Sequence, residues 1–244
     1  MPRLLSICIV NWNTRDYLRA CLRSIRETIA HLDHETIVVD NASADGSAAM
    51  VAEEFPQVML IANADNLKYA AGNNQALRAA TGASKLLLNP DVVLKPGAVE
   101  ELLAALDRHP KAGAVAPRLV HPDGSPQLSC RTFPDPPALA YEALGLARLF
   151  PHSRRFGAYR MSWWAHDDER RVDQPMASAL LIRAAALEAV GLFDEDFPIF
   201  FNDVDLCRRL LDAGWEVWFT PRAEVIHHVG ASTRQVRRAM IAES

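Results

Sequence analysis

Residues 4–40 read LLSICIVNWNTRDYLRACLRSIRETIAHLDHETIVVD, and their pattern gives the first indication of the fold class. The run over 4–10 is apolar throughout, which is typical of a strand buried on both faces of a parallel sheet. Residues 15–31 carry apolar side chains at helical spacing, and ETIVVD (35–40) is a second apolar strand. A strand, a helix and a strand in this order predict a parallel β-α-β unit.

Strands and helices go on alternating as far as residue 120. In a chain of 244 residues this pattern predicts a single α/β domain, built on a mostly parallel, doubly wound sheet flanked by helices. Gly82 is expected to end the helix over 70–80. The other helices are expected over 47–55 and from Pro96 and Gly97 to about Arg108, and the other strands over 58–63, 85–94 and 112–120.

The pattern is less regular over residues 125–172, which are rich in proline. We interpret this segment as an insertion beside a site, with one apolar helix over 138–150. Regular spacing then returns up to the basic tail that begins at Ser232. The expected elements are a strand over 178–182, helices over 183–190 and 202–215, and strands over 216–221 and 223–230.

Composition excludes several classes of protein. The net charge is −4, from 26 basic against 30 acidic residues, which argues against a general nucleic-acid-binding protein. The apolar run at the N-terminus is too short for a signal peptide and no run is long enough to span a membrane, so we expect a cytoplasmic protein. The cysteines form no C-x-x-C pair, which predicts buried free thiols and no zinc site: Cys8, Cys21, Cys130 and Cys207.

Two nucleotide-binding motifs are missing from the first β-α turn. A dinucleotide site needs G-x-G-x-x-G after the first strand, but this chain has NWNTRD there and no glycine before Gly46. The P-loop pattern G-x-x-x-x-G-K-[ST] is also absent. Nicotinamide binding and P-loop chemistry are therefore disfavoured.

Polar residues follow the first two strands. Asn11 and Asn13 come after the first strand, and Asp40 ends the second. Ligands of open α/β sheets bind outside the carboxyl ends of the strands, where Asp40 could accept a hydrogen bond from a base or a ribose. The same residue types also form turns and cap helices, and both readings remain open here.

Asn89, Pro90 and Asp91 interrupt an apolar strand. A carboxylate at a strand end can hold a divalent cation that clamps a diphosphate and neutralises it as it leaves. Asn-Pro also marks an ordinary surface turn, so this motif alone decides nothing.

Two further groups could carry chemistry. Asp203 and Asp205 lie at the start of a helix, where either could take the proton from an attacking hydroxyl; they point in different directions, so at most one is the base. Acids at a helix N-terminus also stabilise the helix dipole, which is the structural alternative. His227 and His228 end the last strand, where a histidine can ligate a metal, bind phosphate or be structural.

The order and spacing of these groups carry more information than any one of them. The chain resembles the family 2 glycosyltransferases of the GT-A fold, in particular their bacterial rhamnosyltransferase-like branch, over nearly its whole length. The matching motifs are VNWNT (10–14), VVDNASADGS (38–47), NLKYAAGNNQA (66–76), LLLNPDV (86–92), VGLFDEDF (190–197), FNDVDLCRRL (201–210) and HHVGAS (227–232).

The resemblance implies an inverting hexosyltransferase, in which the acceptor oxygen attacks the anomeric carbon directly. Asp203 would be the catalytic base, Asp91 the ligand of Mg²⁺ or Mn²⁺, and Asp40 the reader of a pyrimidine base. Residues 1–120 would form the nucleotide-sugar-binding half of the domain and 121–244 the acceptor-binding, catalytic half. The other donor-binding residues implied are Asn11, Asn13, Asn66, Gly72, Asn73, Asp91, His227 and His228.

The resemblance also implies substrates and partners. The expected donor is dTDP-rhamnose, and the expected acceptor is a cell-surface glycan or a lipid-linked acceptor. Arg234, Arg237 and Arg238 could begin an amphipathic helix at the inner membrane face. The oligomeric state stays open, a homodimer included.

Four positions depart from the family pattern: Asn89, Asn202, Tyr69 and Ala76. Asn202 replaces the glutamate that usually precedes the base, which motivates the alternative of a nucleotide-sugar-binding module without catalysis. A nucleotidyltransferase is a further alternative, but it would need a glycine-rich basic loop after the first strand.

Overall fold

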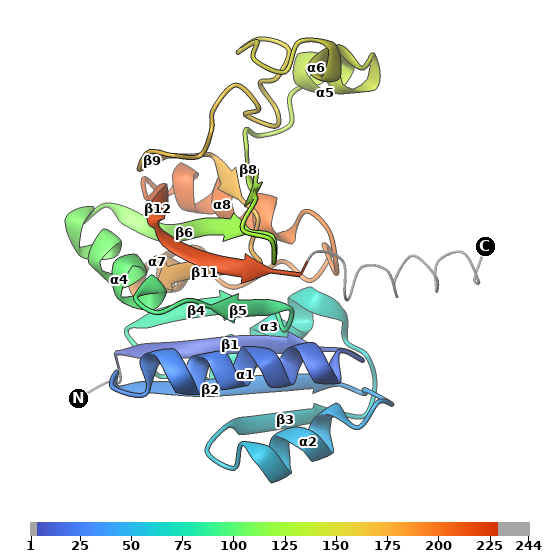
Figure 1. The fold of residues 1–244 in the computed structure, drawn as a ribbon, viewed down its shortest axis with the longest axis vertical. Coiled ribbons are helices and arrows are strands. Elements are labelled where there is room, and N and C mark those ends of the chain that lie inside the picture. Colours follow the sequence, from blue (N-terminus) through green and yellow to red (C-terminus); the bar gives the residue numbers. More distant parts are fainter. Residues whose placement is uncertain (1–3, 229–244) are drawn as a thin grey trace.

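The structure, a computed structural model, describes residues 4–228. A ten-stranded sheet lies between two layers of helices (Figure 1). The helices are α1 (Arg15–Ile29), α2 (Ser47–Glu54), α3 (Lys68–Ala79), α4 (Ala98–Arg108), α5 (Pro136–Ala143), α6 (Leu146–Leu149), α7 (Ala184–Val190) and α8 (Asn202–Asp212). The strands are β1 (Leu5–Asn11), β2 (His34–Asn41), β3 (Met59–Asn63), β4 (Ser84–Leu88), β5 (Val92–Leu94), β6 (Ala112–Val120), β7 (Pro126–Gln127), β8 (Cys130–Arg131), β9 (Arg170–Arg171), β10 (Gln174–Pro175), β11 (Ala179–Arg183) and β12 (Glu216–His227).

The predicted α/β class is confirmed, and the sheet is mixed: the strands from β1 to β4 pair in parallel, as do β6 and β12, whereas β5, β7, β9 and β11 pair antiparallel with their neighbours. Its main order is β3-β2-β1-β4-β11-β6-β12-β5, with β1 parallel to β2 and to β4. The expectation that β6 simply continues a parallel sheet is wrong, because β11 lies between β4 and β6 and runs antiparallel to both. This insertion is a long-range pairing that the local pattern does not contain.

Two predicted elements have different extents. The expected strand over 85–94 is two strands: Asn89-Pro90-Asp91 forms a turn closed by the Val92 N–H and the Asn89 carbonyl, and β5 then pairs antiparallel with β12. The two strands expected over 216–221 and 223–230 are one strand, β12, with an irregularity between Thr220 and Glu224.

Two glycines correct the helix predictions. The helix expected over 138–150 breaks at Gly145, whose φ of 70° ends the run and leaves two short helices, α5 and α6. Gly82 does not cap α3, which ends at Ala79. A Cβ at Gly82 would lie 2.6 Å from the backbone of Leu5, so glycine there permits close approach to β1.

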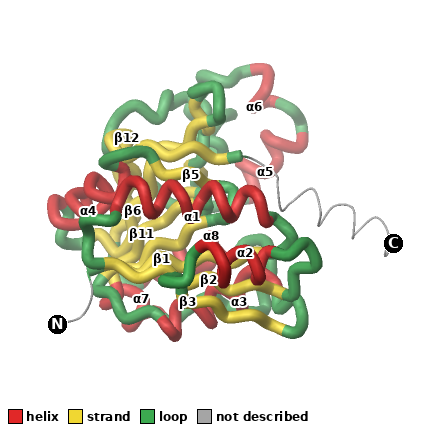
Figure 2. The backbone as a smooth tube through the Cα atoms, turned by 60° about the horizontal axis from the view of Figure 1, so that its bottom comes forward, coloured by secondary structure: helices red, strands yellow, loops and turns green. Residues whose placement is uncertain are grey.

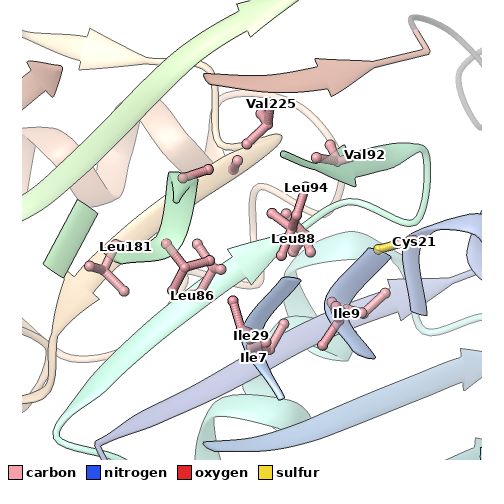
Figure 3. Packing of buried hydrophobic residues seen from close by; sticks show 14 of the residues in the cluster. Ile7, Ile9, Cys21, Ile29, Leu86, Leu88, Val92, Leu94, Leu181 and Val225 are labelled. Carbon is pink, nitrogen blue, oxygen red and sulfur yellow. The ribbon is translucent and has the colours of Figure 1, made fainter. Parts of the chain in front are cut away.

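Each face of the sheet has its own core. One core lies between the sheet and α1, α2 and α4, and the other between the sheet and α3, α7 and α8. In Figure 2, α1 and α4 lie in front of the strands, and Figure 3 shows Ile7 and Ile9 of β1 close to Ile29 and Cys21 of α1. The cysteines are buried and free, as predicted, and burial raises the pKa of Cys8 to about 12.

Candidate active site

The carboxyl ends of β1, β2 and β4 lie side by side, because these strands are neighbours and parallel. The loops at this edge hold several non-glycine residues in the left-handed region: Asn13 (φ 51°), Ala42 (φ 56°), Lys68 (φ 69°) and Phe201 (φ 65°). Such conformations cost about 1–3 kcal/mol each and gather at functional sites. The edge is therefore the candidate site on backbone geometry alone.

The predicted pair Asn11 and Asp40 forms one buried network. Asn11 lies opposite Asp40 in the β1–β2 register, and its Nδ2 donates to Asp40 Oδ1 at 2.8 Å. The second carboxylate oxygen accepts the Ser43 N–H at 3.0 Å, and Asp40 is only 3% exposed. Asn13 belongs to the same loop pair, since its Oδ1 accepts the Ala44 N–H at 2.7 Å. Asp40 thus orders both loops, and a contact with a base stays a prediction.

Helix α3 and the turn before it carry the predicted Gly72 and Asn73, in the helix, and Asn66, in the turn. A Cβ at Gly72 would lie 2.9 Å from Val10 Cγ1, so this glycine lets α3 pack closely on β1. Asn73 is buried and donates to the Tyr69 carbonyl, while Asn66 Oδ1 accepts the Lys68 N–H at the start of the helix. These contacts stabilise the N-terminal end of α3. A contact between these residues and a nucleotide remains a prediction.

Asp91 and His227 face each other inside the protein. Asp91 is 4% exposed and its Oδ1 has no hydrogen-bond partner among the described residues. His227 Nε2 lies 3.5 Å from that oxygen, beyond ordinary hydrogen-bond length. His228 takes the other side of the strand, with its ring 5.4 Å from that of Tyr17. Of the two predicted histidines, it is His227 that faces the carboxylate.

Gln127 fixes the proton on the His227 ring. Its Nε2 donates to the His227 carbonyl at 2.7 Å, which orients the amide and turns Oε1 toward His227 Nδ1 at 2.9 Å. An amide oxygen can only accept, so Nδ1 carries a proton, and in the neutral tautomer the lone pair then lies on Nε2. A lone pair facing an unpartnered carboxylate oxygen leaves a position that a cation fits.

The residues present suit a hard divalent cation with few protein ligands. No group of three or more His, Cys, Asp or Glu that could hold a metal occurs within residues 4–228. Mg²⁺ is commonly held by one or two protein carboxylates together with substrate phosphates. Asp91 and His227 fit that arrangement, with Gln127 orienting the histidine from behind.

Asp203 lies in the first turn of α8. Burial raises the pKa of its carboxyl group, and hydrogen bonds from the backbone of Val204 and Ala177 partly oppose the shift. Burial also raises the pKa of Tyr69, assisted by the negative charges of Asp203 and, less strongly, of Asp91. The Tyr69 hydroxyl is therefore within electrostatic range of both carboxylates, which agrees with a shared site rather than with opposite surfaces.

A short connection links the two carboxylates through the start of β11. The backbone of Ala177 bonds Asp203, and the next residue, Ser178, accepts the Asn89 N–H at 2.8 Å. Asp205 points elsewhere and forms a 2.6 Å ion pair with Arg209. The expectation that only one of the two acids could serve as a base agrees with this divergence.

Sequence reasoning missed the supporting residues. Tyr69 was noted only as a departure from the family pattern, and Gln127 was not considered at all. Gln127 lies in the irregular segment after β6, where nothing local marks it as a partner of His227. Ser43, which accepts from the Asn13 N–H at 2.9 Å, lies in a quoted motif but was not singled out.

Comparison with known proteins identifies the family. Residues 6–162 match the sequence model of Glycosyl transferase family 2. The chain is 32% identical to an N-acetylglucosaminyl-diphospho-decaprenol L-rhamnosyltransferase of Mycobacterium tuberculosis, over 96% of this chain and 78% of that protein.

Solved structures share the fold at lower identity. A mannosyltransferase of Pyrobaculum calidifontis, determined with GDP-Man and Mn²⁺, superposes with a TM-score of 0.64 at 19% identity, over 98% of this chain and 61% of that one. GalNAc-T7, determined with UDP, GalNAc and Mn²⁺, superposes with a TM-score of 0.67 at 13% identity, over 93% of this chain and 44% of that one. The chain is therefore a glycosyltransferase that belongs to family 2 and has the GT-A fold.

Proposed function

We propose that this glycosyltransferase moves a hexose from a nucleotide diphosphate to an acceptor hydroxyl with inversion at the anomeric carbon. Asp91 and His227 would hold Mg²⁺ or Mn²⁺, and Asp203 would be the general base. The observation that carries the proposal is the buried, unpartnered Asp91 Oδ1 facing the His227 Nε2 lone pair. A bound cation would relieve that contact and would neutralise the leaving diphosphate.

Asp203 has the properties that a general base needs. It accepts hydrogen bonds from backbone N–H groups, which keep its carboxylate oriented, while burial raises its pKa. A higher pKa makes the carboxylate a stronger base. Its proton would come from the acceptor hydroxyl as the new glycosidic bond forms and the bond to the diphosphate breaks.

The base can be tested with a matched pair of variants. Asp203→Asn keeps the size and one acceptor oxygen but replaces the other oxygen by an NH2 group and removes the basic carboxylate, so kcat should fall by about 10²–10⁴-fold while donor binding, measured by calorimetry, persists. Asp205→Asn is the control, since Asp205 is engaged with Arg209. Equal turnover of the Asp203 variant and the parent would remove Asp203 from the role. Donor binding without any transfer by the parent would favour the non-catalytic binding module.

The cation site has a test that does not depend on activity. Saturating Mn²⁺ at 100 times its Kd should stabilise the fold by about 2.7 kcal/mol, seen as a rise in Tm. Asp91→Asn and His227→Gln should abolish most of the rise, and His228→Gln should keep it, because that ring lies against Tyr17. A rise that survives in Asp91→Asn would place the cation elsewhere.

The donor and acceptor follow from the similar rhamnosyltransferase. We infer dTDP-rhamnose as the donor and a hydroxyl of a cell-surface glycan, lipid-linked during assembly, as the acceptor, supported by 32% identity to a protein named for a decaprenol-linked substrate. Thermal-shift screening of dTDP, UDP and GDP sugars with and without Mn²⁺ would fix the donor class. A metal-dependent shift with UDP or GDP sugars alone would refute the assignment.

A further inference from the structure

Residues 136–160, which we call the helical arm, leave the sheet after β8 and stand away from the domain. In Figure 1 the arm occupies the top of the molecule, with α5 and α6 beyond β8 and β9. Asp135 caps α5 by accepting the Ala138 N–H at 2.7 Å, and Pro136 follows at the first helical position. The arm therefore has regular, capped secondary structure. None of its residues belongs to the candidate active site.

The arm exposes large apolar side chains around the turn at Gly145. Leu144 and Leu149 are each 71% exposed, the highest values among large apolar residues in the described part of the chain. Phe150 is 51% exposed and Leu139 is 48% exposed. Single exposed leucines are common, but a group of them at the projecting end of a molecule marks an interaction surface.

Unpaired arginines surround this apolar group. The arm holds four arginines and one glutamate, Glu142, in a chain whose net charge is −4. Arg160 pairs with Glu142, while Arg148, Arg154 and Arg155 have no carboxylate partner within residues 4–228. Arg154 lies over the Trp163 ring instead, and Arg155 donates to the Tyr141 hydroxyl at 3.1 Å. Basic charge is thus concentrated where apolar side chains are exposed, and the remainder of the chain is acidic.

We propose that the helical arm docks on an anionic lipid surface. Leu144, Leu149 and Phe150 would enter the interface while the three unpaired arginines meet lipid phosphates. Apolar residues interleaved with arginine are the composition of interfacial segments. The rest of the chain has a net negative charge and would be repelled by the same lipids. The arm is therefore the part expected to contact them. The proposal goes beyond sugar transfer and depends on no catalytic step.

Flotation of the full-length chain with vesicles tests the docking. Vesicles of phosphatidylcholine containing phosphatidylglycerol should bind the protein, and vesicles of phosphatidylcholine alone should not. Replacing the three arginines by glutamine should weaken binding roughly fivefold per residue, about a hundredfold in all. Arg23, Arg78 and Arg222 are exposed elsewhere, so their triple glutamine variant, with an equal charge change, is the matched control and should bind like the parent.

A second measurement locates the contact. Because the native cysteines are all buried, Leu149→Cys offers a single accessible thiol for an environment-sensitive fluorophore. Its emission should shift to the blue with anionic vesicles, while the same label at Met59→Cys, on β3, should not respond. Met59 is 48% exposed and serves as the matched surface site.

Three results would overturn the proposal. Unchanged binding after substitution of the arm arginines would do so, as would loss of binding only when Arg234, Arg237 and Arg238 of the tail are replaced by glutamine. A parent that is dimeric in the ultracentrifuge, becomes monomeric on Leu144→Ser with Leu149→Ser and shows no vesicle binding would assign the arm to a second copy of the chain instead.

Discussion

Replacing Asn202 by glutamate would introduce the residue that the family pattern usually has before the base, yet this chain should be damaged by it. Asn202 is 3% exposed, and its Nδ2 donates to the carbonyls of Ile199 at 2.9 Å and Phe197 at 3.3 Å. A carboxylate cannot donate, so both carbonyls would lose their partner and would face a negative charge. The loop before α8 would have to open to relieve this contact.

The cost can be worked out from those two hydrogen bonds. A buried acceptor left unpaired costs about 1–3 kcal/mol; because these two contacts are only part-buried, the substitution should destabilise the fold by roughly 2–4 kcal/mol in all. In a domain of this size each kcal/mol lowers Tm by about 2–4 °C, which predicts a fall of roughly 4–16 °C. Pro198 in the same loop accepts from the N–H groups of Tyr69 and Ala70, so kcat should fall as well.

Asn202→Gln is the matched control, because it has the length of glutamate but keeps the amide donor. Urea unfolding of both variants at neutral pH should find the glutamate variant less stable by about 2 kcal/mol or more. The difference in unfolding free energy between the two variants should become smaller as pH falls, since a protonated glutamate side chain can donate one hydrogen bond. Equal stability of the two variants at neutral pH would show that these carbonyls do not need the Asn202 amide.

Three further outcomes follow from the packing and the buried charge. Asp203→Asn should raise Tm at neutral pH, because burial raises the pKa of Asp203 and the folded state disfavours the ionised form; scanning fluorimetry should show the advantage shrinking as pH falls through that raised pKa. Gly72→Ala should cost about 1–3 kcal/mol in urea unfolding, since its Cβ would crowd Val10. Arg209→Lys should lose about 1–2 kcal/mol in the same assay, because lysine cannot reach both Asp205 and the Val190 carbonyl.

Local patterns in the sequence were enough to predict the first β-α-β unit and the general class of the fold. The apolar runs that form β1 and β2 are uninterrupted, and α1 buries the face that its spacing indicates. The position of β11 could not be predicted in this way. Its sequence, from Ala179 to Arg183, is a buried strand in any location, and only pairing with distant segments puts it between β4 and β6.

The same distinction holds for the site: local patterns predict some of its residues, and long-range pairing determines the others. Asp40 and Asp91 were found because polar residues that end apolar strands gather at one edge of a parallel sheet. The choice between His227 and His228 could not be made, because alternation puts them on opposite sides without saying which side holds Asp91. The structure decides it: Asp91 lies in the turn before β5, outside the strand alternation, and its Oδ1 is 3.5 Å from His227 Nε2.

The inserted strand also bears on the proposed site, because the residues just before it contact both the turn of Asp91 and the surroundings of Asp203. Ala177, just before β11, meets Asp203, while its neighbour Ser178 holds Asn89 beside Asp91. Had β4 paired directly with β6, no backbone segment would connect the turn at Asn89 to the start of α8. The antiparallel strand that local patterns could not predict is therefore the element that spaces the proposed base from the proposed cation site.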